Sequence, residues 1–323
     1  MEYGPIPWWL AVLFVAGGLV ALKLSAEKFI DGAAGVSRRI GLSPFVVGMV
    51  VVGFGTSAPE LCVSVFSGLG GRSSLSLGNA YGSCICNIAL ILGVATLIKP
   101  LKVSRSVSLF GVPALVAISV MSCLLVASGS GFSRADAFVS LGVFAVVLPL
   151  YCRFSGGGQA QEAPAGRPDS PVWRDWALLL GGLAFLLGSS HILVWGAVET
   201  ARLLGVPELV IGLTVLAVGT SLPELASAVI SARRGEHDMV LGNIIGSNLF
   251  NTLAVVGLAG AISPFKGVSR HILARDMPAM VALSVSIALF ALPGRGRVAR
   301  PLGAVWLALY AGYIALMAFQ EMQ

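Results

Sequence analysis

The sequence predicts an all-α integral membrane protein with ten transmembrane helices, arranged as two inverted repeats of five helices each. Three observations carry this prediction: little charge, a series of long apolar segments, and one phrase that occurs in both halves. Of the 323 residues, 56% are hydrophobic and 11% are charged, and the mean hydropathy is +0.90. A soluble domain carries about 25% charged residues, so this chain lacks the polar surface that water requires.

The basic residues fit a membrane protein better than a nucleic-acid-binding protein. The formal net charge is +6, which in a soluble domain would suggest a nucleic-acid partner. Here Lys and Arg fall in short loops between apolar segments, where they set the orientation of a chain in the bilayer. We therefore expect the lipid bilayer as the surroundings and no nucleic-acid partner.

The ten helices are expected where about 20 mostly apolar residues follow one another. They cover, approximately, residues 6–24, 42–69, 75–98, 106–127, 135–152, 175–203, 206–233, 239–263, 272–293 and 300–319. The first follows no basic region and begins near Trp8 and Trp9, so we expect a retained helix with an interfacial anchor rather than a cleaved signal. The other nine are separated by polar, Gly-rich or Pro-rich turns.

A polar stretch divides the chain into halves. Residues 153–175 are rich in Gly, Pro, Ala and charge, which is typical of a flexible linker. The predicted organisation is a first five-helix repeat over 1–152, a cytoplasmic linker over 153–175 and a second five-helix repeat over 176–323. With both termini outside, the cytoplasmic loops carry most of the 21 Lys and Arg residues, so this orientation is predicted, in the plasma or inner membrane. The basic stretch between Lys266 and Arg275 opposes it.

The repeated phrase places an acid within the membrane twice. Residues 55–60 read GTSAPE and residues 219–224 read GTSLPE, so Glu60 and Glu224 lie 164 residues apart. Because each repeat has an odd number of helices, the two repeats enter the membrane in opposite directions, as in many secondary transporters. Charged side chains are costly inside a bilayer, so two acids at matching positions indicate function.

Each acid is accompanied by polar groups at helical spacing. Thr56 lies four residues before Glu60, on the same helix face, and Pro59 leaves a backbone carbonyl without its helical donor. The following helix carries a stripe at every fourth residue. The stripes are Asn79, Ser83 and Asn87 in the first copy and Asn243, Ser247 and Asn251 in the second.

Together these helices offer only oxygen ligands and a formal charge of −2. Calcium binds 6–8 oxygens, and sodium also accepts carbonyl and hydroxyl oxygens. Zinc and copper are disfavoured, because no His or Cys occupies the stripes. Two carboxylates close together in a low dielectric also attract protons, so we expect protons to compete with cations.

Both blocks resemble the α-repeats of the sodium/calcium exchanger family, in the prokaryotic form that has no large regulatory loop. The similarity covers about residues 42–98 and 206–263, and two copies of GTSxPE, each followed 27 residues later by an Asn, are a specific motif. The resemblance implies exchange of sodium for calcium by alternating access, with the first and sixth helices sliding against the rest. It implies a transporter, not an enzyme, with no cofactor.

The resemblance also assigns cation ligands at matching positions, which are Glu60, Glu224, Thr56, Thr220, Ser57, Ser221, Ser83, Ser247, Asn87 and Asn251, with the backbone at Gly53 and Ala217. Potassium-dependent relatives carry Asp at the position of Asn251, so its absence argues against potassium transport. Cys84 stands where the second copy has Asn248. Either Cys84 lies off the site, or the first stripe offers fewer oxygens.

Other functions stay open at this point. The first alternative is a calcium/proton antiporter on the same fold, motivated by proton competition at the acid pair. An ion channel or a non-transporting membrane protein is the alternative of another class. An ATP-driven pump is disfavoured, because the sequence has no phosphate-binding loop motif.

Overall fold

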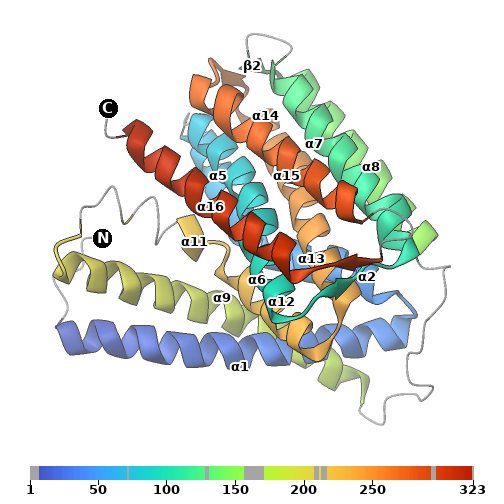
Figure 1. Ribbon diagram of the computed structural model, residues 1–323, viewed down its shortest axis with the longest axis vertical. Helices are drawn as coiled ribbons and strands as arrows, with labels where there is room; N and C mark the ends of the chain where they lie inside the picture. Colours follow the sequence, from blue (N-terminus) through green and yellow to red (C-terminus); the bar gives the residue numbers. More distant parts are fainter. Residues whose placement is uncertain are drawn as a thin grey trace.

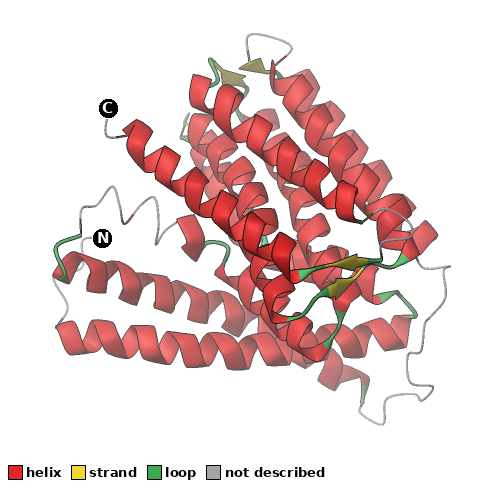
Figure 2. Ribbon diagram, viewed as in Figure 1, coloured by secondary structure: helices red, strands yellow, loops and turns green. Residues whose placement is uncertain are grey.

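The computed structural model describes residues 7–70, 73–127, 131–155, 171–206, 211, 217–291 and 296–321. The described chain is almost entirely helical (Figures 1 and 2). Its helical elements, with η for a π-helical turn, are α1 (Trp8–Ile40), α2 (Pro44–Val47), η1 (Gly48–Gly53), α3 (Phe54–Thr56), α4 (Ala58–Leu69), α5 (Ser73–Cys86), η2 (Asn87–Leu92), α6 (Gly93–Ile98), η3 (Val107–Gly111), α7 (Val112–Ala127), α8 (Arg134–Ser155), α9 (Val172–Leu203), α11 (Ala217–Gly219), α12 (Leu222–Arg234), α13 (His237–Leu249), η5 (Phe250–Val255), α14 (Val256–Ile262), η6 (Ile272–Asp276), α15 (Met277–Phe290) and α16 (Arg300–Glu321).

Within the described residues, eight helices are long and apolar enough to cross a membrane, or nine if a bent pair counts as one. The pair is Pro44–Thr56 and Ala58–Leu69, which meet at 47°. The chain is thus a multi-pass membrane protein, and nine of the predicted segments each overlap with one of these helices. The other predicted segment, 206–233, falls partly outside the described residues.

The first helix is much longer than predicted. The expected span of 6–24 ends before Glu27 and Asp31, but α1 continues as far as Ile40. Both acids have partners on that extension. Asp31 accepts a hydrogen bond from Arg234 of α12 at 2.7 Å, and Glu27 lies 3.9 Å from Lys23. Paired acids at the membrane edge do not stop a helix, which is why the hydropathy pattern placed its end too early.

α1 and α9 form an antiparallel pair whose direction crosses that of the remaining bundle (Figure 1). Glycines let the two backbones approach closely. A Cβ added at Gly32 would stand 2.6 Å from Leu179 Cα, and one added at Gly182 would stand 2.7 Å from Phe29 Cα. Ser25 and Ser189, 164 residues apart, share a hydrogen bond of 3.3 Å between the two helices.

The centre of the bundle is built by α5 to α6 and α13 to α14. In the most apolar window of each span, 89% of His237–Ile262 and 72% of Leu75–Ile98 are buried, against 39% or less for the other spans. These two segments contain the predicted polar stripes. Each also has a π-helical turn near the end of its stripe, η2 at Asn87 and η5 at Phe250. Such turns are frequent at functional sites.

Four strands of two residues each add to the helices. β1 (Leu101–Lys102) pairs antiparallel with β4 (Arg297–Val298), and β2 (Gly131–Phe132) pairs antiparallel with β3 (Phe265–Lys266). Each ladder joins one half of the chain to the other. The two ladders lie at opposite ends of the bundle (Figure 2). In the region predicted as a linker, α8 reaches Ser155 and α9 begins at Val172, and residues 156–170 between them lie outside the described part.

Candidate cation site

The two repeated phrases occupy helix breaks inside the bundle. In the first copy, α3 ends at Thr56 and α4 begins at Ala58, so Ser57 stands at the bend. In the second, α11 ends at Gly219 and α12 begins at Leu222. Pro59 and Pro223 each lie in the first turn of the following helix, where the missing N–H leaves no donor unsatisfied. The sequence therefore places each acid in the first turn of a new helix.

Glu60 and Glu224 are both buried, each 1% exposed, and lie close enough to interact electrostatically. The Ser57 hydroxyl donates to Glu224 Oε1 at 3.0 Å, so this bond joins the first repeat to the acid of the second. The other oxygen of Glu224 and both carboxylate oxygens of Glu60 have no hydrogen-bond partner. Three buried carboxylate oxygens are thus available to a ligand.

The stripes lie behind the acids and hold their helices in place. Asn79 donates to the backbone oxygen of Glu60 at 3.1 Å, and Asn243 donates to the backbone oxygen of Glu224 at 3.4 Å. Asn79 and Asn243 thus make the same bond in the two copies. Neither was among the predicted ligands, although their four-residue spacing from Ser83 and Ser247 was the signal that linked them to the site.

Further along the stripes, more oxygen atoms are buried without partners. Asn87 Oδ1, Asn243 Oδ1 and both side-chain polar atoms of Asn251 have no hydrogen bond. Buried polar groups are normally satisfied, so a group of such atoms needs an explanation. The oxygen atoms among them, like the three carboxylate oxygens, are of the type that a hard cation prefers.

Some predicted ligands are already occupied by protein contacts. The Gly53 carbonyl accepts from Ser247 Oγ at 3.2 Å and from the Ser57 backbone N–H at 3.1 Å. Thr56 Oγ1 donates to the Val52 carbonyl at 2.9 Å, which leaves its lone pairs free to accept or to coordinate. These bonds join the break in the first phrase to the stripe of α13.

The remaining predicted residues are placed less symmetrically. Ser83 and Ser221 are buried, and Ser221 lies beside the Cys86 thiol and makes no hydrogen bond with the Glu60 carboxylate. Thr220 is half-buried at the second break. Ala217 begins α11, and its side chain is outside the described part. Asn248, which was not predicted as a site residue, is buried and accepts a hydrogen bond from Asn87 at 2.9 Å.

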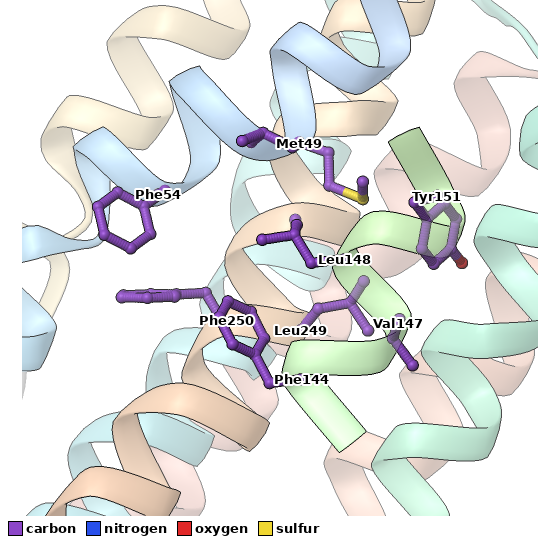
Figure 3. A pocket seen from close by; sticks show the side chains of 10 residues that line it. Met49, Phe54, Phe144, Val147, Leu148, Tyr151, Leu249 and Phe250 are labelled. Atoms are coloured by element: carbon purple, nitrogen blue, oxygen red, sulfur yellow. The ribbon is translucent and has the colours of Figure 1, made fainter. Parts of the chain in front are cut away.

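A cavity of about 210 Å³ is lined by residues other than the two acids (Figure 3). Its wall is formed by apolar and aromatic side chains, including Met49, Phe54, Phe144 and Phe250. The Tyr151 hydroxyl at its edge already donates to the Phe110 carbonyl at 2.6 Å. The cavity therefore lacks the ligands that a cation needs and is distinct from the acid pair.

Comparisons with known proteins point to one family. The family model described as sodium/calcium exchanger protein matches residues 10–151 and 174–319. The putative antiporter CaxA of Alkalimonas amylolytica is 38% identical over 95% of this chain and 98% of its own length. The sodium/calcium exchanger MaX1 of Methanosarcina acetivorans is 28% identical over 94% of this chain and 97% of its own.

Among solved structures, the sodium-calcium exchanger NCX_Mj, soaked with zero Na+ and Ca2+, is similar throughout. It has a TM-score of 0.83 and 30% identity, and the match covers 95% of this chain and 98% of that chain. The resemblance first seen in the two phrases therefore extends over the fold as a whole.

Proposed function

The chain belongs to the sodium/calcium exchanger protein family, a family of transporters rather than enzymes, and we propose that it is a secondary active antiporter that exchanges sodium for calcium. One central site takes either cargo, and the proposal needs no cofactor. Relatives named as sodium/calcium exchangers support these ions as the substrates.

The observation that carries the proposal is the unpaired carboxylate of Glu60 beside that of Glu224. Both oxygens of Glu60 and one of Glu224 are buried without partners, and among the described residues no ion pair involves either acid. A buried charge is stable only when it is paired. A divalent cation between the two acids would balance their charge of −2.

The other predicted ligands complete the site in this proposal. Calcium takes the carboxylates of Glu60 and Glu224 and completes its coordination with hydroxyl, carboxamide and carbonyl oxygens. Sodium ions take overlapping positions among the same oxygens. Those oxygens come from Thr56, Thr220, Ser57, Ser221, Ser83, Ser247, Asn87, Asn251, Gly53 and Ala217. Because the positions overlap, the two cargoes exclude one another, and the site crosses the membrane with one or the other.

We further propose that residues 1–152 and 176–323 are inverted repeats, joined by a linker over 153–175. The equivalent bonds of Asn79 and Asn243 support this proposal, as do the two strand ladders. β1 and β3 lie 164 residues apart in the sequence, and each pairs with a strand of the other half. Alternating access then follows if α1 and α9 move as a pair against the bundle.

The orientation proposed from the loop charges has both termini outside the cell, in the plasma or inner membrane. This places Arg234 and Arg39 at the cytoplasmic ends of their helices. Each contacts an acid of another helix, with Arg234 at Asp31 and Arg39 at Asp175. The basic residues on this side follow the positive-inside rule.

A proton remains the second candidate counter-ion. The observation that favours it is again the acid pair, because protonation would neutralise Glu60 without any cation. The fold and the calcium site would be the same in both cases, so only a transport measurement separates them.

The test is uptake of radioactive calcium into proteoliposomes of the purified chain. Vesicles are loaded with sodium, with potassium or with an acidic buffer. They are then diluted into a calcium buffer that lacks the loaded ion or, for the acidic vesicles, has a neutral pH, so that an outward gradient forms. We expect uptake with sodium inside, little with potassium, and loss of uptake when a sodium ionophore removes the gradient. Uptake driven by the pH gradient alone would identify the proton antiporter instead.

Two further results would contradict exchange altogether. Calcium flux that rises linearly with concentration, without saturation, would indicate a channel. Absence of both flux and calcium binding in a folded chain would indicate a membrane protein that does not transport.

A further inference from the structure

The two helices that carry the polar stripes differ at the residue directly after the serine of each stripe. The first helix reads Ser83-Cys84 and the second reads Ser247-Asn248. Cys84 and Asn248 lie 164 residues apart and touch each other. The Cys84 thiol donates to the Asn248 backbone carbonyl at 3.8 Å, and Asn248 Nδ2 donates to the Cys84 backbone carbonyl at 3.5 Å.

Asn248 fixes the carboxamide of Asn87. Asn87 Nδ2 donates to Asn248 Oδ1 at 2.9 Å, and both side chains are buried. A carboxamide has an NH2 group that donates hydrogen bonds and a carbonyl oxygen that accepts them. With its nitrogen held by Asn248, Asn87 leaves its oxygen as the free atom, and that oxygen is buried without a partner.

The second half has no matching bond. By the repeat, Asn251 Nδ2 should donate to a side-chain oxygen at position 84, and η5 packs against α5 as η2 packs against α13. Cys84 has no carbonyl oxygen in its side chain. Both Oδ1 and Nδ2 of Asn251 are accordingly buried and unpaired.

We propose that Asn248 is a positioning residue, which holds Asn87 as an oriented oxygen ligand, and that Cys84 leaves Asn251 without such support. This inference rests on the proposed function, because it assigns the roles of Asn87 and Asn251 within that cation site. An oriented ligand binds more tightly than a free one, since no ordering is needed when the ion arrives. The site is thus well organised on one side and adaptable on the other.

The experiment adds the missing partner and removes the existing one. Calcium affinity is measured by titration calorimetry in sodium-free detergent for the wild type, Cys84→Asn, Asn248→Cys and the double variant that exchanges the two residues. Cys84→Ala is the matched control, because it removes the thiol without offering an oxygen. Sodium affinity is measured by competition on the same samples.

We expect Cys84→Asn to bind calcium about fivefold more tightly, the effect of one neutral hydrogen bond. Cys84→Ala should match the wild type. Asn248→Cys should weaken binding by about five- to tenfold, and the exchanged pair should return to within about twofold of the wild type, because one carboxamide is again oriented.

The melting temperatures of the cation-free proteins distinguish a positioning role of Asn248 from a purely structural one. The inference requires affinity to change in Cys84→Asn and to recover in the exchanged pair without a parallel change in melting temperature. Equal affinities for Cys84→Asn and Cys84→Ala overturn it, even if Asn248→Cys fails to fold. A wild-type chain that binds neither calcium nor sodium overturns the proposed function as well, whereas wild-type exchange with equal variants overturns this inference alone.

Discussion

At the scale of single residues, Glu60 and Glu224 carry the charge of the site but differ in their surroundings. Glu224 accepts a hydrogen bond from Ser57, while Glu60 has no partner for its carboxylate. A neutral amide at either position removes one of two charges that face a divalent ion. The shape of the side chain is kept, so a change in binding reports the charge.

We predict that Glu60→Gln and Glu224→Gln each weaken calcium binding at least about 100-fold, the scale of losing one partner of a buried charge pair. Titration calorimetry and calcium uptake would measure the loss. Glu199→Gln is the matched control, because Glu199 pairs with Arg202 on α9 at 2.7 Å, away from the phrases. Unchanged binding in both variants would remove the acids from the site.

Burial of the Glu236 carboxylate should make the stability of the protein depend on pH. It lies between α12 and α13, and burial raises its pKa above the ordinary value, with Asp31 raising it further and Arg234 and Arg38 opposing the shift. Between the ordinary and the raised pKa, the folded chain therefore binds more protons than the unfolded chain. Stability falls as pH rises through this window.

We expect Glu236→Gln to raise the melting temperature more at about pH 8 than at about pH 5, because the variant carries no charge to bury. The comparison uses the purified protein in one detergent at constant salt. An equal offset at the two pH values would show that Glu236 does not titrate across this range.

At the scale of elements, the α1–α9 pair depends on glycines at its crossing points. Four of these glycines occupy equivalent positions in the two halves of the chain: Gly18 corresponds to Gly182, and Gly32 corresponds to Gly196. A side chain at these positions would enter the backbone or side chain of the partner helix. The pair therefore keeps its spacing only while these positions stay small.

We predict that Gly32→Ala destabilises the protein by about 1–3 kcal/mol, because its Cβ would meet the Leu179 backbone. Gly17→Ala is the control on the same helix, since nothing lies within 4 Å of its added Cβ. That variant should be neutral or stabilising, given the better helix propensity of Ala. Equal melting temperatures for the two variants would mean that α1 and α9 separate easily.

The sequence predicted most spans because a bilayer demands a long apolar run, and that demand is visible locally. It missed the extension of α1 to Ile40, on which Asp31 accepts a hydrogen bond from Arg234 of a distant helix. It also missed the π-helical turns at Asn87 and Phe250, which no local pattern marks. Such features depend on contacts between the halves of the chain.

The acid pair was predictable for a different reason, namely that Glu60 and Glu224 violate the hydropathy of their segments. Asn248 was missed as a site residue because the comparison of the copies found Cys84 opposite it. The Asn of the Gly-Ser-Asn triplet in the second copy, residues 246–248, was the signal that could have identified it. Its bond to Asn87 requires the fold.

At the scale of the whole molecule, the two halves meet through ladders at opposite ends of the bundle (Figure 2). In inverted repeats, equivalent positions lie on opposite sides of the membrane. In parallel repeats they lie on the same side. Ala135 and Ala299, 164 residues apart and both exposed, stand beside β2 and β4 and distinguish these arrangements.

We predict that Ala135→Cys is labelled from outside the cell by a membrane-impermeant maleimide, whereas Ala299→Cys is labelled only after the cells are permeabilised. The five native cysteines are first replaced, so that each variant carries a single thiol. Arg105→Cys, before α7, should behave like Ala299→Cys, because its loop carries Lys99 and Lys102 on the predicted cytoplasmic side. Labelling of both alanine positions from the same side would contradict the inverted arrangement, and exchange of the two results would keep the inversion but reverse the orientation of both termini.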